Sequence, residues 1–405
     1  MKVLVQKFGG TSVSTEEQRK IVVGRVAAAI REGYKVVVVV SAMGRMGAAY
    51  ATDTLKGLVK NENILAKKDL DLLMACGEII SSVVMVSELK SEGIEATCLT
   101  GGQAGIITDD CFNDARIIRI KPSEIIKEFE HNQVVIVAGF QGITEEGKIT
   151  TLGRGGSDTT AAALGVALNA VRIDIYTDVD GVKTADPKIV DNAKTLDKVT
   201  YNEVCQLAHE GAKVIHPRAV EIAMQGNIPL RVLSTFKEGE GTLVANGVSL
   251  KGEPVTDIKN DRIITGITQK TNISQLIINN PERDQQLSKK VFTALALAKI
   301  SVDFISINEM ETIFTVKENN CQKAISIILD LGLDVVTNHR CAKVAAVGAG
   351  MTGVPGVMAN IVEALTDKGI KILQSADSYT SIWCLVHQED MEEAVRALHE
   401  KFNLG

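Results

Sequence analysis

The chain has 405 residues, of which 45% are hydrophobic and 23% are charged, a balance typical of a soluble globular protein with two or three domains. Its formal net charge of -6 excludes a general nucleic-acid binder, because such proteins need a basic face. The start of the chain lacks the apolar segment of a secretory signal, and an apolar run such as Val36 to Val40 is far too short to span a membrane. We therefore expect a cytoplasmic protein that contacts no membrane.

The seven cysteines are scattered, with no C-x-x-C pair and no clustering with histidine. An odd and dispersed set of this kind predicts reduced, mostly buried thiols. We expect neither a disulfide framework nor a structural metal site.

The beginning of the chain predicts a strand, a glycine loop and a helix. The strand is Val3 to Phe8, the loop is Gly9-Gly10-Thr11-Ser12, and the helical pattern runs from Glu16 to Ile30. Lys7, at the end of the strand, would stand beside a loop whose backbone can approach an anion. A lysine at this position suits a phosphate.

Further apolar runs predict strands at 34–40, 96–99, 134–138, 171–176 and 228–233, with helical stretches between them. Strands and helices that alternate at this spacing indicate an α/β fold with a mostly parallel sheet covered on both faces. In such sheets ligands bind at the carboxyl ends of the strands.

A second glycine stretch, Thr151 to Gly165, is the centre of the predicted site. It follows the strand pattern 134–138 and leads into Thr159 to Leu168, whose Ala and Leu content favours helix. Its glycines permit positive φ, Ser157 and Asp158 are helix-capping types, and Arg154 is a forked cation suited to a carboxylate or phosphate. The stretch therefore predicts a site for an acidic small molecule, although composition alone leaves a plain strand-to-helix turn open.

Three polar side chains near predicted loops are further candidates. Ser41 and Thr52 follow the strand 34–40 and could contact a ligand through their hydroxyls, but Thr52 or Asp53 could equally cap a helix before Leu55. Glu78 lies in an apolar helical pattern, where it would face either solvent or a cationic group such as a substrate ammonium. His216 precedes a proline, which biases it out of helix, and we interpret it as structural.

Three motifs lie far apart in the sequence. They are Lys7-Phe-Gly-Gly-Thr-Ser12, Thr151-Leu-Gly-Arg-Gly-Gly-Ser-Asp158 and Tyr176-Thr-Asp-Val-Asp-Gly-Val with Thr184-Ala-Asp-Pro187. Together they resemble the aspartokinases of the amino-acid kinase fold family. The resemblance covers the whole chain. It implies transfer of the ATP γ-phosphoryl group to the side-chain carboxylate of L-aspartate, which gives 4-phospho-L-aspartate and begins lysine, threonine and methionine biosynthesis. The chain contains neither a Walker loop nor protein-kinase motifs, so ATP would be bound by this other architecture.

The resemblance assigns roles to matching positions. Lys7 and Asp158 correspond to catalytic residues of the family. The lysine neutralises charge on the transferred phosphoryl group, and the aspartate organises the catalytic lysines. Aspartate-binding positions are Ser41, Thr52, Glu78, Arg154, Gly155, Gly156 and Ser157. ATP-binding positions are Lys7, Phe8, Gly9, Gly10, Thr177, Asp178, Lys183, Lys188 and Lys213. The expected cofactor is ATP with nucleotide-bound Mg²⁺, and no metal ligated by the protein is expected.

The chemistry agrees with these roles. An aspartate side chain has a pKa of about 3.9, so the acceptor is ionised at neutral pH and needs no general base. The reaction needs relief of repulsion between two anions, which lysines, loop amides and Mg²⁺ can supply.

The tail repeats itself with an offset of 70 residues: Ala294-Leu295 matches Ala364-Leu365, and Ala324-Ile325 matches Ala394-Val395. Each copy predicts strand, helix, strand, strand, helix, and two ferredoxin-like βαββαβ units at this place resemble the paired ACT domains of aspartokinases. We predict a kinase domain at 1–245, a linker at 246–261, and ACT domains at 262–341 and 342–405. ACT sheets commonly pair, which implies a homodimer or larger oligomer.

The resemblance places a feedback effector at the turn before the first helix of each copy. The second copy has Gly353-Val-Pro-Gly-Val357 there, whereas the first has Asn279-Asn-Pro-Glu-Arg283. The segment from Gln374 to Trp383 is more similar to the diaminopimelate-regulated Gram-positive form, so lysine, threonine and meso-diaminopimelate all stay open as effectors.

Three other functions remain to be compared. Another amino-acid kinase, of the glutamate or acetylglutamate type, would share the fold. An amino-acid-sensing binding protein would have an inactive kinase half. A dehydrogenase would use the G-x-G-x-x-G pattern at 348–353, but too few residues follow it for a dinucleotide-binding fold.

Overall fold

The computed structural model describes residues 1–61, 64–212, 214–246, 263–351 and 354–405. The chain forms two compact units: an N-terminal unit of residues 1–182, 195–209 and 213–260, and a C-terminal unit of residues 183–194, 210–212 and 261–405. This division differs from the predicted boundary at 245, because two short segments of the kinase-like sequence pack with the C-terminal unit. The predicted linker, apart from Asn246, lies outside the described residues.

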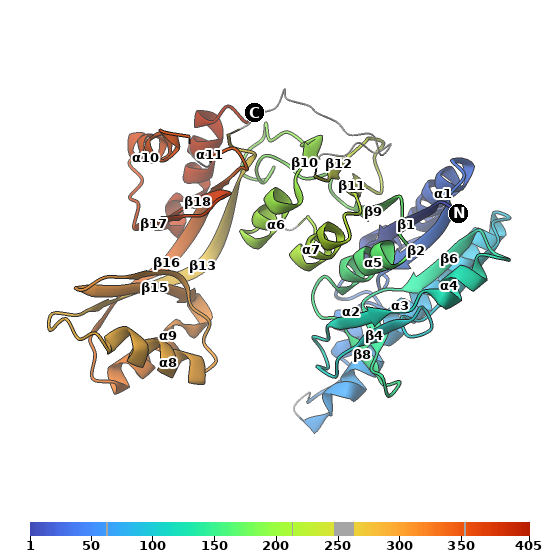
Figure 1. The fold of residues 1–405 in the computed structure, drawn as a ribbon, viewed down its shortest axis with the longest axis horizontal. Helices are drawn as coiled ribbons and strands as arrows, with labels where there is room; N and C mark the ends of the chain where they lie inside the picture. Colours follow the sequence, from blue (N-terminus) through green and yellow to red (C-terminus); the bar gives the residue numbers. More distant parts are fainter. Residues whose placement is uncertain (62–63, 213, 247–262, 352–353) are drawn as a thin grey trace. The chain divides into compact units, whose positions relative to one another are not determined.

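The described part of the N-terminal unit is built on an eight-stranded sheet in the order β10-β12-β11-β9-β1-β2-β6-β3 (Figure 1). Neighbouring strands are parallel except β11 and β12, as the sequence predicts. Its strands are β1 Val3–Phe8, β2 Lys35–Val40, β3 Ala96–Leu99, β6 Val134–Ala138, β9 Arg172–Thr177, β10 Lys198–Val199, β11 Leu230–Ser234 and β12 Thr242–Val244.

Helices cover both faces of this sheet. Valines of α1 (Glu16–Arg31) and apolar residues of α3 (Lys67–Ser91) pack on one face, and α5 (Gly156–Ala167) packs on the other with α7 (Pro217–Gln225) beside it. Shorter helices of the unit are η1 Gly10–Ser12, α2 Thr52–Lys56, α4 Ser123–Glu128 and α6 Tyr201–His209. Among the described residues, α3 is long and apolar enough to cross a membrane, but half of its apolar window is buried in the unit. We interpret it as a core helix.

The alternation of side chains along β1 decides which face carries Lys7. Leu4 and Phe8 belong to the core beneath α1 and α3. Val5 points to the opposite face, where a Cβ added to Gly165 of α5 would lie 3.8 Å from it. Because successive side chains of a strand alternate between faces, Lys7 shares the face of Val5 and points toward α5.

The structure corrects the prediction around the second glycine stretch. A hairpin of β7 (Gln141–Ile143) and β8 (Ile149–Thr151) separates this stretch from β6 and forms a small sheet with β4 (Ile106–Thr108) and β5 (Ile117–Ile120). The helix begins at Gly156 rather than Thr159. Its N-cap is Gly155, at φ +70°, so neither Ser157 nor Asp158 caps it.

The C-terminal unit confirms the predicted repeat, since α8 begins at 287 and α10 at 357, an offset of 357 − 287 = 70. The first copy is β13 Gly266–Asn279, α8 Leu287–Leu297, β14 Asp303–Ile307, β15 Glu311–Lys317 and α9 Glu318–Asp330. The second copy is β16 Val335–Val347, α10 Val357–Asp367, β17 Gln374–Asp377, β18 Ser381–His387 and α11 Met391–Lys401.

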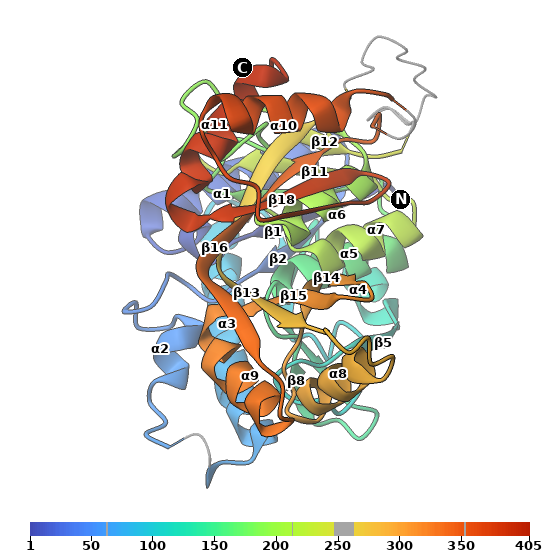
Figure 2. The ribbon, with the colours of Figure 1, turned by 90° about the vertical axis from the view of Figure 1, so that its left-hand side faces the viewer.

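Both copies share one sheet, in the order β14-β15-β13-β16-β18-β17. Residues 273–279 of β13 pair with β15, whereas residues 266–270 pair with the end of β16 that also pairs with β18. Figure 2 shows these two long strands running between the helices of the two copies. The predicted boundary between 341 and 342 therefore falls inside β16.

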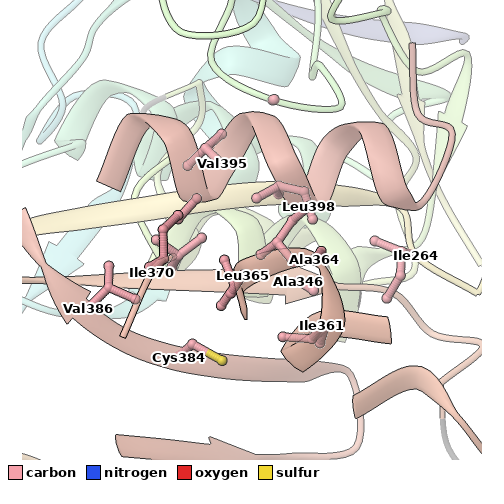
Figure 3. Close-up of a cluster of buried hydrophobic side chains, with 14 of the residues drawn as sticks. Ile264, Ala346, Ile361, Ala364, Leu365, Ile370, Cys384, Val386, Val395 and Leu398 are labelled. Atoms are coloured by element: carbon pink, nitrogen blue, oxygen red, sulfur yellow. The ribbon is translucent and has the colours of Figure 1, made fainter. Parts of the chain in front are cut away.

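The second copy has its own core, in which Leu365 of α10, Leu398 of α11 and Val386 of β18 belong to one buried apolar cluster (Figure 3). Ala185 and Val190, from the segment 183–194, are buried in the same core. This apolar contact explains why that segment belongs to the C-terminal unit.

The segment 210–212 belongs to this unit through a buried ion pair. The Lys343 ammonium lies 2.9 Å from the Glu210 carboxylate and 4.3 Å from the centre of the Trp383 ring. Gly211 fits directly against the backbone of β13, because a Cβ there would lie 2.0 Å from the carbonyl oxygen of Gln269.

Candidate active site

Lys7 and Asp158 form the centre of the site. The Lys7 Nζ lies 2.7 Å from the Asp158 Oδ1, and both side chains are only 13% exposed. Asp158 is in the first turn of α5, and its Oδ2 also accepts a hydrogen bond of 3.3 Å from the backbone N–H of His216. The carboxylate therefore fixes the lysine amine at the carboxyl end of β1.

The glycine loop after β1 lies directly beside this amine. A Cβ added to Gly9 would be 3.7 Å from the Lys7 Nζ, and one added to Gly10 would be 2.4 Å from the carbonyl oxygen of Ala42. The Gly44 N–H donates a hydrogen bond of 2.9 Å to the Gly10 carbonyl, so the loops after β1 and β2 are packed backbone to backbone. Only glycine fits such a close approach.

Phe8, which the sequence assigns to ATP binding, has its side chain in the core. Its ring is fully buried and stacks on Tyr176, with 4.6 Å between the ring centres. Any contact of Phe8 with a nucleotide would come from its backbone.

The second glycine stretch brings Arg154 to the same place. Gly155 adopts φ +70°, and a Cβ there would lie 2.2 Å from the His216 ring. Burial lowers the pKa of His216, the Asp158 carboxylate opposes this shift, and the charges of Arg218, His209 and Arg154 add smaller decreases. The backbone N–H of His216 also binds Asp158. The exposed Arg154 and the Lys7–Asp158 pair therefore both lie near His216.

Glu78 is a buried carboxyl group in α3. It is 2% exposed, and its Oε1 accepts a hydrogen bond of 3.0 Å from the Ala42 N–H. Burial raises the pKa of Glu78 to about 8, and the hydrogen bond from the Ala42 N–H and the nearby Thr52 hydroxyl partly offset this effect. Its Oε2 has no partner at hydrogen-bonding geometry. A buried and unsatisfied carboxylate oxygen fits an ammonium group.

The predicted hydroxyl residues lie around the same loops. Ser41 follows β2 directly, and its N–H donates to the Phe8 carbonyl. Thr52 is the first residue of α2, whose N-cap is Ala51 with no side-chain cap, so the capping interpretation was wrong. Ser157 is 8% exposed, and its Oγ lies 2.9 Å from the place a Cβ on Gly139 would take. Gly156 packs against Phe140.

The predicted nucleotide positions are brought together only in part. Thr177 and Asp178 lie at the end of β9, beside β1, where the Thr177 hydroxyl donates to the Asp178 carboxylate at 3.2 Å. Lys183 and Lys188 lie in the segment that packs with the C-terminal unit. Lys213 lies outside the described residues.

Sequence reasoning missed Asp71, which anchors the second glycine stretch. Asp71 is fully buried in α3 and accepts hydrogen bonds from the Thr151 N–H at 2.9 Å, the Thr151 hydroxyl at 2.6 Å and the Asn113 N–H at 3.0 Å. Burial raises the pKa of Asp71, and these hydrogen bonds oppose that shift. The available signal was a carboxylate within the apolar helical pattern, the same signal that marks Glu78.

The C-terminal unit contains a cavity apart from this site. A cavity of about 540 Å³ lies in the C-terminal unit, between residues 189–192 and α11, and no predicted site residue lines it. Within the described ranges, no group of three or more His, Cys, Asp or Glu side chains could hold a metal ion. The Lys7 amine and the loop amides beside it fit a nucleotide phosphate.

Comparisons with known proteins show the family of the chain. The model of the amino acid kinase family matches residues 2–234, and an ACT domain model matches residues 336–400. Aspartokinase 1 of Bacillus subtilis is 52% identical over 407 residues, which cover 100% of both chains.

Two solved structures of Escherichia coli aspartokinase III are also similar. The structure in complex with aspartate and ADP, called the R-state, has a TM-score of 0.78 at 25% identity, and the structure in complex with lysine and aspartate, called the T-state, has a TM-score of 0.75 at 25% identity. Each comparison covers 99% of both chains. The family models, the full-length identity and the shared fold show that the chain belongs to the aspartokinases of the amino acid kinase family, with C-terminal ACT domains.

Proposed function

We propose that this chain transfers the γ-phosphoryl group of ATP to the side-chain carboxylate of L-aspartate, giving 4-phospho-L-aspartate and ADP. The observation that carries the proposal is the Lys7–Asp158 ion pair beside the glycine loop. Arg154 precedes Gly155, which packs against His216, and Glu78 binds the Ala42 N–H in the loop after β2. The relatives named above are aspartokinases, and the E. coli structure with aspartate and ADP supports both substrates.

In the proposed reaction the acceptor carboxylate is already ionised, so no base has to remove a proton. Lys7 and the amides of Gly9 and Gly10 reduce the repulsion between the carboxylate and the phosphoryl group. Asp158 holds the Lys7 amine in place. The carboxylate oxygen forms the new bond to phosphorus as the bond to the ADP oxygen breaks. Mg²⁺ bound to ATP supplies further charge neutralisation.

Substrate recognition follows from charge and burial. Arg154, whose guanidinium can hold a carboxylate by two parallel hydrogen bonds, binds an acidic group of aspartate. Glu78 receives the ammonium through its unsatisfied Oε2. Ser41, Thr52 and Ser157 complete the aspartate site. Thr177, Asp178, Lys183, Lys188 and Lys213 complete the nucleotide site.

We propose that the C-terminal unit regulates the reaction. We expect the two ACT copies, 262–341 and 342–405, to bind lysine, threonine or meso-diaminopimelate and to inhibit the reaction, and we expect a cytoplasmic homodimer or larger oligomer. The lysine complex of the E. coli relative supports an amino acid as effector.

The proposal is tested by trapping the product. Purified protein is incubated with aspartate, ATP, Mg²⁺ and hydroxylamine, which converts an acyl phosphate to a hydroxamate. Aspartate should give hydroxamate and ADP in equal amounts, and neither glutamate nor N-acetylglutamate should replace it. Hydroxamate from glutamate alone would overturn the proposal in favour of another amino-acid kinase.

A further inference from the structure

Arg45 joins two loops that flank the glycine loop. It lies in the loop after β2, and its Nη2 contacts the Asp178 Oδ2 at 2.7 Å. Asp178 follows β9, and β1 lies between β2 and β9 in the sheet. The arginine side chain therefore crosses the carboxyl end of β1, where Gly9 and Gly10 lie.

The backbone beside Arg45 is fixed to the glycine loop. Gly44, at φ +86°, donates its N–H to the Gly10 carbonyl at 2.9 Å. On the other side, the Gly47 N–H donates to the Thr54 hydroxyl at 3.0 Å. The Lys7 amine lies beside Gly9, and Gly44, the residue before Arg45, binds Gly10. Lys7 and the backbone at Arg45 therefore both adjoin the glycine loop.

The ion pair between Arg45 and Asp178 contributes little to folding. The two side chains are 73% and 48% exposed, and pairs this exposed are weak because water screens them. The pair does, however, hold a forked cation above a loop suited to an anion. A guanidinium is the side chain best shaped for two hydrogen bonds to phosphate oxygens.

We propose that Arg45 binds the terminal phosphate of the nucleotide, and that Asp178 is a positioning residue that holds the guanidinium over the glycine loop. This inference rests on the proposed phosphotransferase function and adds a second cation to Lys7 at the phosphoryl group. The Arg45 side chain reaches the phosphate from the β2 side, whereas Lys7 reaches it from β1.

The first experiment compares Arg45→Ala and Arg45→Lys with a matched control. Arg119→Ala removes another exposed arginine that pairs with a carboxylate, Glu145, in the small sheet. Initial rates are measured by hydroxamate formation with ATP and aspartate varied separately. Arg45→Ala should lower kcat/KM for ATP by about tenfold or more, the scale of a charge-assisted contact. Its KM for aspartate should stay within about twofold, Arg45→Lys should recover part of the loss, and Arg119→Ala should match the wild type.

The second experiment measures binding of a non-hydrolysable ATP analogue and of AMP by calorimetry. Arg45→Ala should weaken the analogue and leave AMP unchanged. Asp178→Asn should weaken the analogue less than Arg45→Ala does, and the double variant should be no worse than Arg45→Ala alone.

The inference is overturned if Arg45→Ala binds the analogue and turns over like the wild type, or if the analogue and AMP weaken equally. In either case an active wild-type protein leaves the phosphotransferase function standing. A wild-type protein that forms no aspartyl hydroxamate would instead overturn the proposed function itself.

Discussion

At the scale of single residues, the paired charges of Lys7 and Asp158 make the strongest prediction. Replacing either residue by alanine should lower turnover by about two orders of magnitude or more, because Lys7 contacts the transferred phosphoryl group and Asp158 holds the Lys7 amine in place. Hydroxamate formation measures the effect. Lys20→Ala, which removes an exposed lysine paired with Glu16, is the control and should have no effect. Near-normal turnover of folded Lys7→Ala would refute its role.

Glu78 predicts how aspartate binding depends on pH. Its pKa is raised to about 8 by burial, so below that pH the carboxyl is largely protonated and a poor partner for an ammonium. The KM for aspartate should therefore fall as pH rises toward about 8. Glu78→Gln should raise the KM and remove this dependence. An unchanged pH profile in Glu78→Gln would show that another group titrates.

The same group predicts a pH effect on stability. Because the folded-state pKa of about 8 lies above the ordinary 4.5, the folded protein binds this proton more tightly than the unfolded chain. The resulting stabilisation is present below about pH 4.5 and is lost as pH rises through about 8. Thermal unfolding should show Glu78→Gln gaining stability relative to the wild type over this window. A constant difference between the two proteins would contradict the buried position of the carboxyl.

Sequence patterns predict the residues that carry chemistry in short motifs, such as Lys7, Arg154 and Asp158. They predict less well the residues whose importance comes from a distant partner. Asp71 binds Thr151, and Arg45 reaches Asp178; neither pairing follows from local spacing. Glu78 also needed the structure, because a glutamate in a helix is as compatible with solvent as with a buried site.

At the scale of elements, Asp71 joins α3 to β8 and to the start of the second glycine stretch. Asp71→Ala should lower the free energy of unfolding by about 1 to 3 kcal/mol, since it leaves the buried N–H of Thr151 without its acceptor. Denaturant unfolding measures the loss, with Glu124→Ala at an exposed ion pair as control. A loss no larger than that of the control would show that water replaces the carboxylate.

The long apolar runs predict the central strands well. Val3–Phe8 is predicted with the bounds the structure has, and Lys35–Val40 within one residue. The hairpin of β7 and β8 is missed because its three-residue strands are too short to show a period. The N-cap of α5 is misassigned because a glycine at positive φ took the place that Ser157 and Asp158 favour by type.

At the scale of the whole molecule, the repeat of 70 residues predicts both copies of the C-terminal unit. It cannot predict that residues 183–194 and 210–212 join that unit, since this depends on Ala185 and Val190 entering its core and on Glu210 pairing with Lys343. Nor can it predict that β13 and β16 serve both copies. Partners more than 100 residues apart leave no local signal.

The regulatory proposal predicts that an amino acid inhibits the full-length chain. Lysine, threonine or meso-diaminopimelate should lower the hydroxamate rate. Gly356, the N-cap of α10, has φ +92°. Gly356→Ala, which strains the proposed effector turn, should weaken inhibition while leaving the uninhibited rate unchanged. Arg283→Ala changes the matching turn of the first copy, so comparing inhibition of the two variants shows which copy binds the effector. If none of the three amino acids inhibits, the regulatory proposal is wrong.

The most direct test of the central claim is acceptor specificity in the hydroxylamine assay. With L-aspartate, ATP and Mg²⁺, the wild-type protein should form hydroxamate and ADP in equal amounts. The Lys7→Ala variant should form no hydroxamate. Hydroxamate formation from glutamate or N-acetylglutamate in place of aspartate, or none from any of the three, would contradict the account.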